Sequence, residues 1–135
     1  MNLFAYGTLM CADILYRVAA CRPACAPATL AAYRRCAVRN EVYPGIVEDD
    51  AARVSGVVYW GVPEGAWRRL DKFEGEMYSR RPVRVLLEDG TSTDAATYVI
   101  TPEFAHRLAA SDWSYEEFLR SGKKIFEAGY PGFDE

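Results

Sequence analysis

The chain has 135 residues, half of them apolar and about a quarter charged, with a formal net charge of −3. This balance is typical of a folded globular domain rather than a disordered or fibrous chain, so we expect one domain over residues 1–135. The mild acidity and the lack of a basic patch argue against nucleic acid as a partner. No run approaches the roughly 18 apolar residues of a membrane span, and no signal peptide precedes the first predicted strand, so we expect a cytoplasmic protein that is not bound to a membrane.

The first half of the chain carries patterns of both strands and helices. Its segments are a strand over residues 2–6 that Gly7 ends, a helix over Ala12–Ala20, one or two short strands within residues 28–48 with a turn at Tyr43-Pro44-Gly45, and a strand over Arg53–Trp60. The four cysteines all fall within this half, at positions 11, 21, 25 and 36. Only Cys21 and Cys25 are close in sequence, so the spacing does not predict a zinc site. In a cytosolic chain we also expect no disulfide.

The second half begins with a helix whose two ends are both marked. Pro63 stands at its start, and Gly75 is a natural residue to follow its end near Phe73 or Glu74. Asp89-Gly90 then predicts a hairpin between strands at Tyr78–Glu88 and Thr93–Ile100. Residues 102–127 are expected to form two or three short helices, with Gly122 separating the later two, and the tail from Gly129 to pack loosely on the body. Hairpin connections favour a mixed or antiparallel sheet, so the predicted fold class is mixed α/β, with a curved sheet or small barrel and helices packed against it.

Glu74 is the first candidate for chemistry. On the predicted 63–74 helix, Trp67, Leu70, Asp71 and Glu74 share one face, and the two apolar members require that face to point inward. A carboxylate carried inward at the last helical turn opposes the helix dipole and is costly to ionise. The structural alternative is an ion pair with Arg80, Arg81 or Lys72, and the sequence does not decide between the two.

The second candidate is the segment Tyr6-Gly7-Thr8-Leu9. A strand ends here, glycine permits an unusual backbone angle, and a helix follows shortly afterwards. Successive N–H groups in such a turn can form an anion-binding nest. An ordinary strand-to-helix turn would have the same sequence pattern. The sole histidine, His106, falls on a predicted surface helix, so a Cys11–His106 nucleophile pair would depend on a long-range coincidence.

Several segments together resemble the gamma-glutamylcyclotransferase-like superfamily, in particular its avirulence-induced-gene-like and gamma-glutamylamine cyclotransferase branch. The matching pieces are Phe4–Met10, Val54–Tyr59 and Leu70–Gly75, followed by Tyr78, Arg80 and Val83, and they extend over most of residues 3–85. The proline turn at residues 43–46 also falls where the family often has one. Beyond residue 100 the resemblance is thin.

The resemblance implies a small barrel-like mixed α/β fold with a pocket. It implies that Glu74 is the catalytic acid and base, that Tyr6, Gly7, Thr8, Leu9 and Tyr78 bind the substrate, and that no cofactor or metal is used. The partner would be a small gamma-glutamyl compound, from which the α-amino group attacks within the molecule and releases 5-oxoproline. One glutamate can serve as base and then acid if its pKa lies near neutrality.

Two other functions remain open at this point. A binding module would keep the pocket without turnover, although a pure binder of an anionic ligand would gain from losing the negative charge at Glu74. An acyl-transfer enzyme using Cys11 would need a base beside the thiol, and none is near in sequence. The leaving amine and the oligomeric state are not readable from the sequence.

Overall fold

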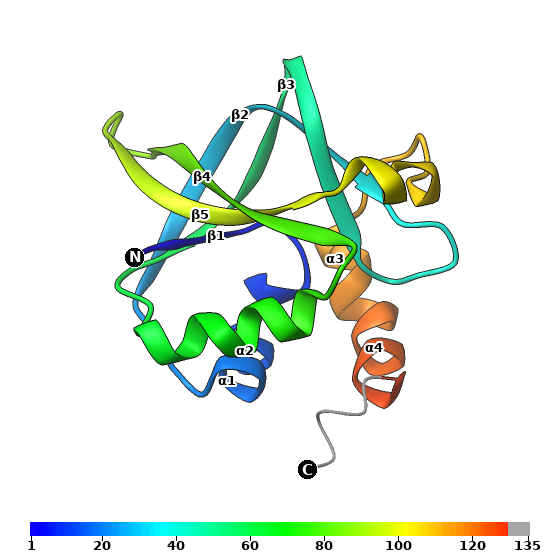
Figure 1. Cartoon of the computed structure of the whole chain (residues 1–135), viewed down its shortest axis with the longest axis horizontal. Helices are drawn as coiled ribbons and strands as arrows, with labels where there is room; N and C mark the ends of the chain where they lie inside the picture. Colours follow the sequence, from blue (N-terminus) through cyan, green and yellow to red (C-terminus); the bar gives the residue numbers. More distant parts are fainter. Residues whose placement is uncertain (130–135) are drawn as a thin grey trace.

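The computed structural model describes residues 1–129. Five strands form a closed barrel in the order β1-β3-β2-β4-β5, and the helices lie against it (Figure 1). The elements are β1 (Leu3–Ala5), the 3-10 turn η1 (Thr8–Met10), α1 (Ala12–Ala19), β2 (Cys25–Ala37), β3 (Pro44–Tyr59), α2 (Glu64–Glu74), β4 (Tyr78–Leu87), β5 (Ser92–Ile100), the 3-10 segment η2 (Pro102–Arg107), α3 (Tyr115–Glu117), the π-helical segment η3 (Phe118–Gly122) and α4 (Lys123–Gly129). The predicted mixed α/β fold class with a barrel-like sheet is confirmed.

The barrel is antiparallel except at its closure. β1 pairs antiparallel with β3, and a parallel pairing of Leu3 with Ala96 on β5 closes the ring. Successive side chains of a strand point to opposite faces, so β1 serves two cores. Leu3 and Ala5 face the helices, whereas Phe4 and the following Tyr6 belong to the cluster inside the barrel. β1 therefore lies between the barrel interior and the helical layer, and the chain that leaves it is held from both sides.

The helical layer packs through apolar faces that the sequence pattern predicts. Ile14 and Leu15 of α1 and Trp67 and Leu70 of α2 are buried in one cluster. α1 and α2 run side by side under the barrel, and α3 and α4 lie beside them (Figure 1). No helix among residues 1–129 combines the length and the apolar character that crossing a bilayer requires.

Two expectations about local structure are wrong. The turn placed at Tyr43-Pro44-Gly45 lies at residues 38–43 instead, and Pro44 begins β3, where a missing N–H costs little. The one or two short strands predicted within residues 28–48 belong instead to two long strands, β2 and β3, and the strand predicted over Arg53–Trp60 forms the second half of β3. The boundary expected at Gly122 is present as a change of helix type, since η3 ends at Gly122 and α4 begins at Lys123 without a break in the helical backbone. Gly122 packs closely on Val42. The expectation for the tail falls largely on residues 130–135, which lie outside the described residues.

Candidate active site

Helix α2 places Glu74 at the edge of the barrel. The helix begins after Pro63 and ends at Gly75, which has a positive φ of 72° that suits glycine. Trp67 is 5% exposed and Leu70 is fully buried, so the predicted face of the helix does point inward. Glu74, one turn beyond Leu70, is therefore carried into the space between α2 and the end of β1.

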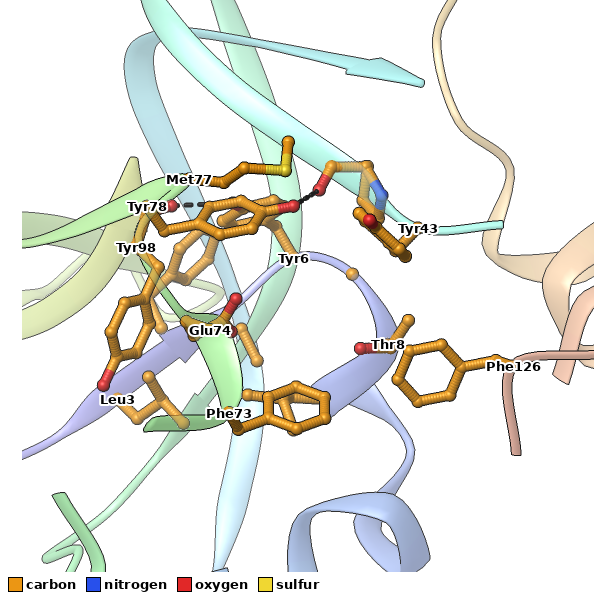
Figure 2. Close-up of a pocket in the computed structure, with 15 residues that line it drawn as sticks. Leu3, Tyr6, Thr8, Tyr43, Phe73, Glu74, Met77, Tyr78, Tyr98 and Phe126 are labelled. Atoms are coloured by element: carbon orange, nitrogen blue, oxygen red, sulfur yellow. Dashed lines mark hydrogen bonds between the residues drawn. The ribbon is translucent and has the colours of Figure 1, made fainter. Parts of the chain in front are cut away.

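That space is a pocket of about 230 Å³. This is somewhat below the roughly 300–1,000 Å³ of typical small-molecule sites, so it suits a small metabolite. All six residues that the sequence predicts for the site line it, which brings Glu74 opposite the Tyr6–Leu9 loop (Figure 2). The lining residues are Leu3, Phe4, Ala5, Tyr6, Gly7, Thr8, Leu9, Tyr43, Pro44, Phe73, Glu74, Met77, Tyr78, Tyr98 and Phe126. The roles of the six in catalysis or binding stay predictions.

The Glu74 carboxyl has no ion-pair partner in the described part of the chain. Arg80, one of the expected partners, lies 3.6 Å from the Asp71 carboxylate instead, and Tyr98 donates to the same Asp71 oxygen at 2.7 Å. Glu74 keeps some exposed surface because it lines the pocket, but protein encloses the carboxyl on its other sides. Burial, and secondly the negative charge of Asp71, raise the pKa of Glu74 to about 8.

A carboxyl with this pKa can exchange a proton in either direction near neutral pH. At pH 7 most Glu74 side chains are protonated, and forming the carboxylate costs only about 1.4 kcal/mol. General acid–base catalysis is most effective when the pKa of the group lies near the working pH. The pocket lining contains no Lys, Arg or His among the described residues, so Glu74 is its only ionisable group besides the tyrosines.

In the Tyr6–Leu9 loop the backbone carbonyls accept hydrogen bonds from within the protein, whereas three backbone N–H groups donate none among the described residues. The Gly7 and Thr8 carbonyls accept from the N–H groups of Met10 and Cys11 at 3.0 and 3.2 Å, and the Tyr59 hydroxyl donates to the Leu9 carbonyl at 2.7 Å. Within residues 1–129, no hydrogen bond occupies the N–H groups of Gly7, Thr8 and Leu9. Buried N–H groups rarely go unpaired, so three successive free donors beside a pocket indicate a site for an anion or oxyanion.

Gly7 has φ −132° and ψ −132°, a pair outside the α and β regions, as the sequence led us to expect. Glycine is also required here for a steric reason. A Cβ at Gly7 would lie 2.8 Å from both Cδ and Cγ of Pro44, which is closer than side-chain carbons approach. Pro44 thus limits how close the loop can come to β3. The sequence did not indicate this contact, because it placed Pro44 in a turn.

The tyrosine hydroxyls around Glu74 are already engaged. Tyr6 donates to the Tyr98 carbonyl and Tyr78 donates to the Pro44 carbonyl, each at 2.7 Å (Figure 2). Burial raises the pKa of both Tyr6 and Tyr78 well above the ordinary value of 10, so both stay neutral. They offer aromatic surface to a ligand, while the Thr8 hydroxyl points toward the pocket centre and Glu74.

An aromatic wall opposite Tyr78 was not predicted. Phe126 of α4 makes edge-on contacts with Tyr43 and Phe73, with ring centroids 6.4 and 5.9 Å apart. Phe73 stands next to Glu74 in sequence and could have been suspected. Tyr43 and Phe126 come from a loop and a late helix, and no local signal connects them to the loop at residues 6–9.

The thiols and the histidine do not join this site. The Cys11 sulfur contacts the Tyr115 hydroxyl at 3.4 Å, and burial raises the pKa of Cys11, which disfavours a reactive thiolate. His106 is exposed on η2. Among the described residues no three or more His, Cys, Asp or Glu side chains gather as a metal site would need. The expectation of a site without metal or cofactor stays a prediction.

Comparison with known proteins shows the family of the chain and agrees with its fold. The model of the family described as gamma-glutamyl cyclotransferase, AIG2-like, matches residues 3–115. The chain belongs to this family. AIG2-like protein D of Arabidopsis thaliana is 33% identical to it over 119 residues, which cover 87% of this chain and 78% of that relative. The resemblance seen in the sequence is therefore confirmed.

Solved structures extend the likeness of this AIG2-like chain to three dimensions. A solution structure of a protein from Arabidopsis thaliana is 29% identical, with a TM-score of 0.71 over 94% of this chain and 85% of that one. A structure named gamma-glutamyl cyclotransferase is 20% identical, with a TM-score of 0.69 over 97% of this chain and 81% of that one, and it shows a shared fold. Phe126 lies outside the segment that the family model matches.

Proposed function

We propose that this chain is a gamma-glutamyl amine cyclotransferase in which Glu74 is the general acid and base. The observation that carries the proposal is a carboxyl in an apolar pocket, opposite three backbone N–H groups, with no ion-pair partner for the former and no acceptor for the latter among residues 1–129. Membership of the gamma-glutamyl cyclotransferase, AIG2-like family supports the same reaction class. The names of the AIG2-like relatives state no activity, so the proposal depends on this site.

The reaction can be written with the groups present. The Glu74 carboxylate takes a proton from the substrate's α-ammonium group, whose pKa of about 8 is close to its own. The neutral amine attacks the γ-carbonyl carbon of the same molecule, which forms the ring C–N bond and an oxyanion. The protonated Glu74 then gives its proton to the departing nitrogen, and the oxyanion re-forms the carbonyl as the old C–N bond breaks. The ring nitrogen still carries a second hydrogen from the attacking amine, and it returns that proton to the Glu74 carboxylate to become the neutral lactam N–H. Glu74 passes this proton to the released amine, so 5-oxoproline and an ammonium product leave and the carboxylate is regenerated. The reaction consumes no water and no other reactant.

The backbone donors and the pocket walls support the ring closure. N–H groups at Gly7, Thr8 and Leu9 suit the α-carboxylate or the tetrahedral oxyanion. Tight apolar walls restrict the flexible glutamyl chain, and an intramolecular reaction gains most when its reactive conformer is held. The aromatic wall, together with a lining whose described residues include no cation, favours a leaving amine that carries no carboxylate.

The direct test is mass spectrometry of 5-oxoproline after incubation with a panel of gamma-glutamyl amines and gamma-glutamyl dipeptides. We expect release from the wild-type protein and loss of about 10²–10⁴-fold in kcat for Glu74→Gln, because Gln cannot transfer the proton. Glu76→Gln is the matched control, since Glu76 is exposed and does not line the pocket. A wild-type protein that binds these compounds without releasing 5-oxoproline would instead be a binding module.

A further inference from the structure

Arg35 of β2 lies directly behind the Tyr6–Leu9 loop and does not line the pocket. Its side chain is only 15% exposed. Nη1 donates to the Tyr6 carbonyl at 3.0 Å, while Nε and Nη2 donate to the two carboxylate oxygens of Asp112 at 2.9 and 3.4 Å. The Trp113 ring centroid lies 5.3 Å from the guanidinium carbon. Nη1 also donates to the Ser55 carbonyl at 3.5 Å. The guanidinium plane is thus held by Asp112, by two backbone carbonyls and by the Trp113 ring, and one of these contacts is with the loop.

The contact with the Tyr6 carbonyl fixes the direction of the next N–H group. In a trans peptide the carbonyl and the following N–H point in opposite directions, and the described residues contain no cis peptide bond. Holding the Tyr6 carbonyl toward Arg35 therefore turns the Gly7 N–H away from Arg35. Since Gly7 lines the pocket and Arg35 lies outside it, that direction is the pocket side.

We propose that Arg35 is a positioning residue that aims the Gly7 N–H at the anionic centre of the bound substrate. This inference rests on the proposed cyclotransferase function and adds a residue that touches no reacting atom. Tyr6 is then held at both ends, by Arg35 at its carbonyl and by the Tyr98 carbonyl at its hydroxyl. A peptide plane held in this way needs no reorganisation when charge develops on the substrate.

The role requires orientation rather than charge. Asp112 makes a bidentate contact that balances the positive charge of Arg35, so little of that charge is left to act across the loop. A lysine has one ammonium in place of the planar fork, and it cannot hold Asp112 and the Tyr6 carbonyl in the same fixed geometry. Arg35→Lys should therefore retain only part of the function, and Arg35→Ala should retain less.

The kinetic test compares Arg35→Ala and Arg35→Lys with Arg34→Ala. Arg34 is the next residue on the same strand, pairs with Asp49 at 3.2 Å and lies away from the loop, so it is the matched control. Loss of one oxyanion donor typically costs about 10²–10³-fold in kcat, and a donor that is misaimed rather than removed should cost about 10-fold or more. We expect kcat to fall for Arg35→Ala with a smaller change in KM, an intermediate value for Arg35→Lys, and no change for Arg34→Ala.

A second measurement separates this inference from the proposed function. In the ¹H–¹⁵N spectrum of the ligand-free protein, the Gly7 amide signal should broaden or split in Arg35→Ala and stay single in the wild type and in Arg34→Ala. If the wild type releases no 5-oxoproline, the cyclotransferase proposal fails, and the Gly7 signal alone still decides whether Arg35 positions the loop. A single Gly7 signal in Arg35→Ala would overturn the inference, as would lower thermal stability with unchanged kcat measured well below the melting temperature.

Discussion

Two carboxylates one helical turn apart have different surroundings. Asp71 is exposed and is engaged by the Tyr98 hydroxyl and by Arg80, whereas Glu74 is enclosed and forms no ion pair within residues 1–129. Different surroundings of two neighbouring carboxyl groups are a common basis for separate acid and base roles. Asp71 also acts on Glu74 directly, because its negative charge is the second cause of the raised pKa of Glu74.

Asp71→Asn should therefore move the pH dependence of turnover. Removing the charge lowers the pKa of Glu74, so the acidic limb of the kcat profile should shift to lower pH. The shift should be modest, since burial is the larger cause and is unchanged. Asn keeps an oxygen that can accept from Tyr98, so the helix should stay in place. The measurement is kcat for 5-oxoproline release across neutral pH, and a profile that does not move would mean that another group sets the limb.

Gly7→Ala tests the close approach of the loop to Pro44. The new Cβ would lie 2.8 Å from the proline ring, which is held in β3 and cannot swing aside. We expect a loss of stability of about 1–3 kcal/mol from overpacking, together with a large drop in kcat as the loop shifts. Gly65→Ala is the control, because nothing lies within 4 Å of its Cβ position and alanine favours the helix. Full activity in Gly7→Ala would show that the loop position is not critical.

At the scale of elements, the well-predicted parts are those with local signals at both ends. α2 lies between Pro63 and Gly75 as expected, and the Asp89-Gly90 turn joins β4 to β5. The face of α2 that carries Glu74 follows from helical spacing alone. The resemblance to the family indicated that the Tyr6–Leu9 loop faces Glu74. Residues 6–9 and 74 at the centre of the pocket could therefore be predicted from the sequence.

The long strands β2 and β3 were not predictable in the same way. Their register shifts between Ala31 and Tyr33, where Ala32 adopts a positive φ of 66°. An alanine in this conformation leaves no sequence signal, unlike a glycine. The barrel closes through pairings between distant residues, and only that closure decides which faces are buried. The aromatic wall and the contact of Arg35 with the loop depend on the same distant pairings.

Helix α4 contributes the wall residue that lies farthest from the other site residues in sequence. Phe126 contacts Tyr43, Phe73 and Phe118, so Phe126→Ala should remove aromatic contacts and enlarge the pocket. We expect a loss of stability of about 1–3 kcal/mol and a several-fold rise in KM for substrates with an apolar leaving amine, with a smaller effect on kcat. Ile125→Ala, at a side chain that is 62% exposed on the same helix, is the control. Equal KM values for the two variants would remove Phe126 from the binding surface.

At the scale of the whole molecule, the pocket lies at the junction of the barrel and the helical layer. β1, α2, β4, β5 and α4 all contribute lining residues. The burial of Glu74 is therefore a property of the complete fold and is lost when the chain unfolds. The ordinary pKa of 4.5 then applies in place of the folded value of about 8. A group with this difference couples proton binding to folding.

The sign of the coupling can be stated. Between pH 4.5 and 8 the folded protein keeps the Glu74 proton and the unfolded chain loses it, so rising pH favours unfolding. The stabilisation is fully present below pH 4.5 and is lost as pH rises through the folded pKa of about 8. Each rise of one pH unit in this window lowers the free energy of unfolding by at most about 1.4 kcal/mol, and the total loss is at most a few kcal/mol.

Glu74→Gln should abolish this dependence while keeping nearly the same side-chain volume. We expect the variant to match the wild type near pH 5 and to become more stable than it as pH approaches 8, since only the wild type must keep a carboxyl buried. Thermal melts of the wild type, Glu74→Gln and Glu76→Gln across this range measure the difference, and the Glu76 variant should follow the wild type. If Glu74 were a structural ion-pair partner, Glu74→Gln would instead be the less stable protein throughout the range, and turnover would survive.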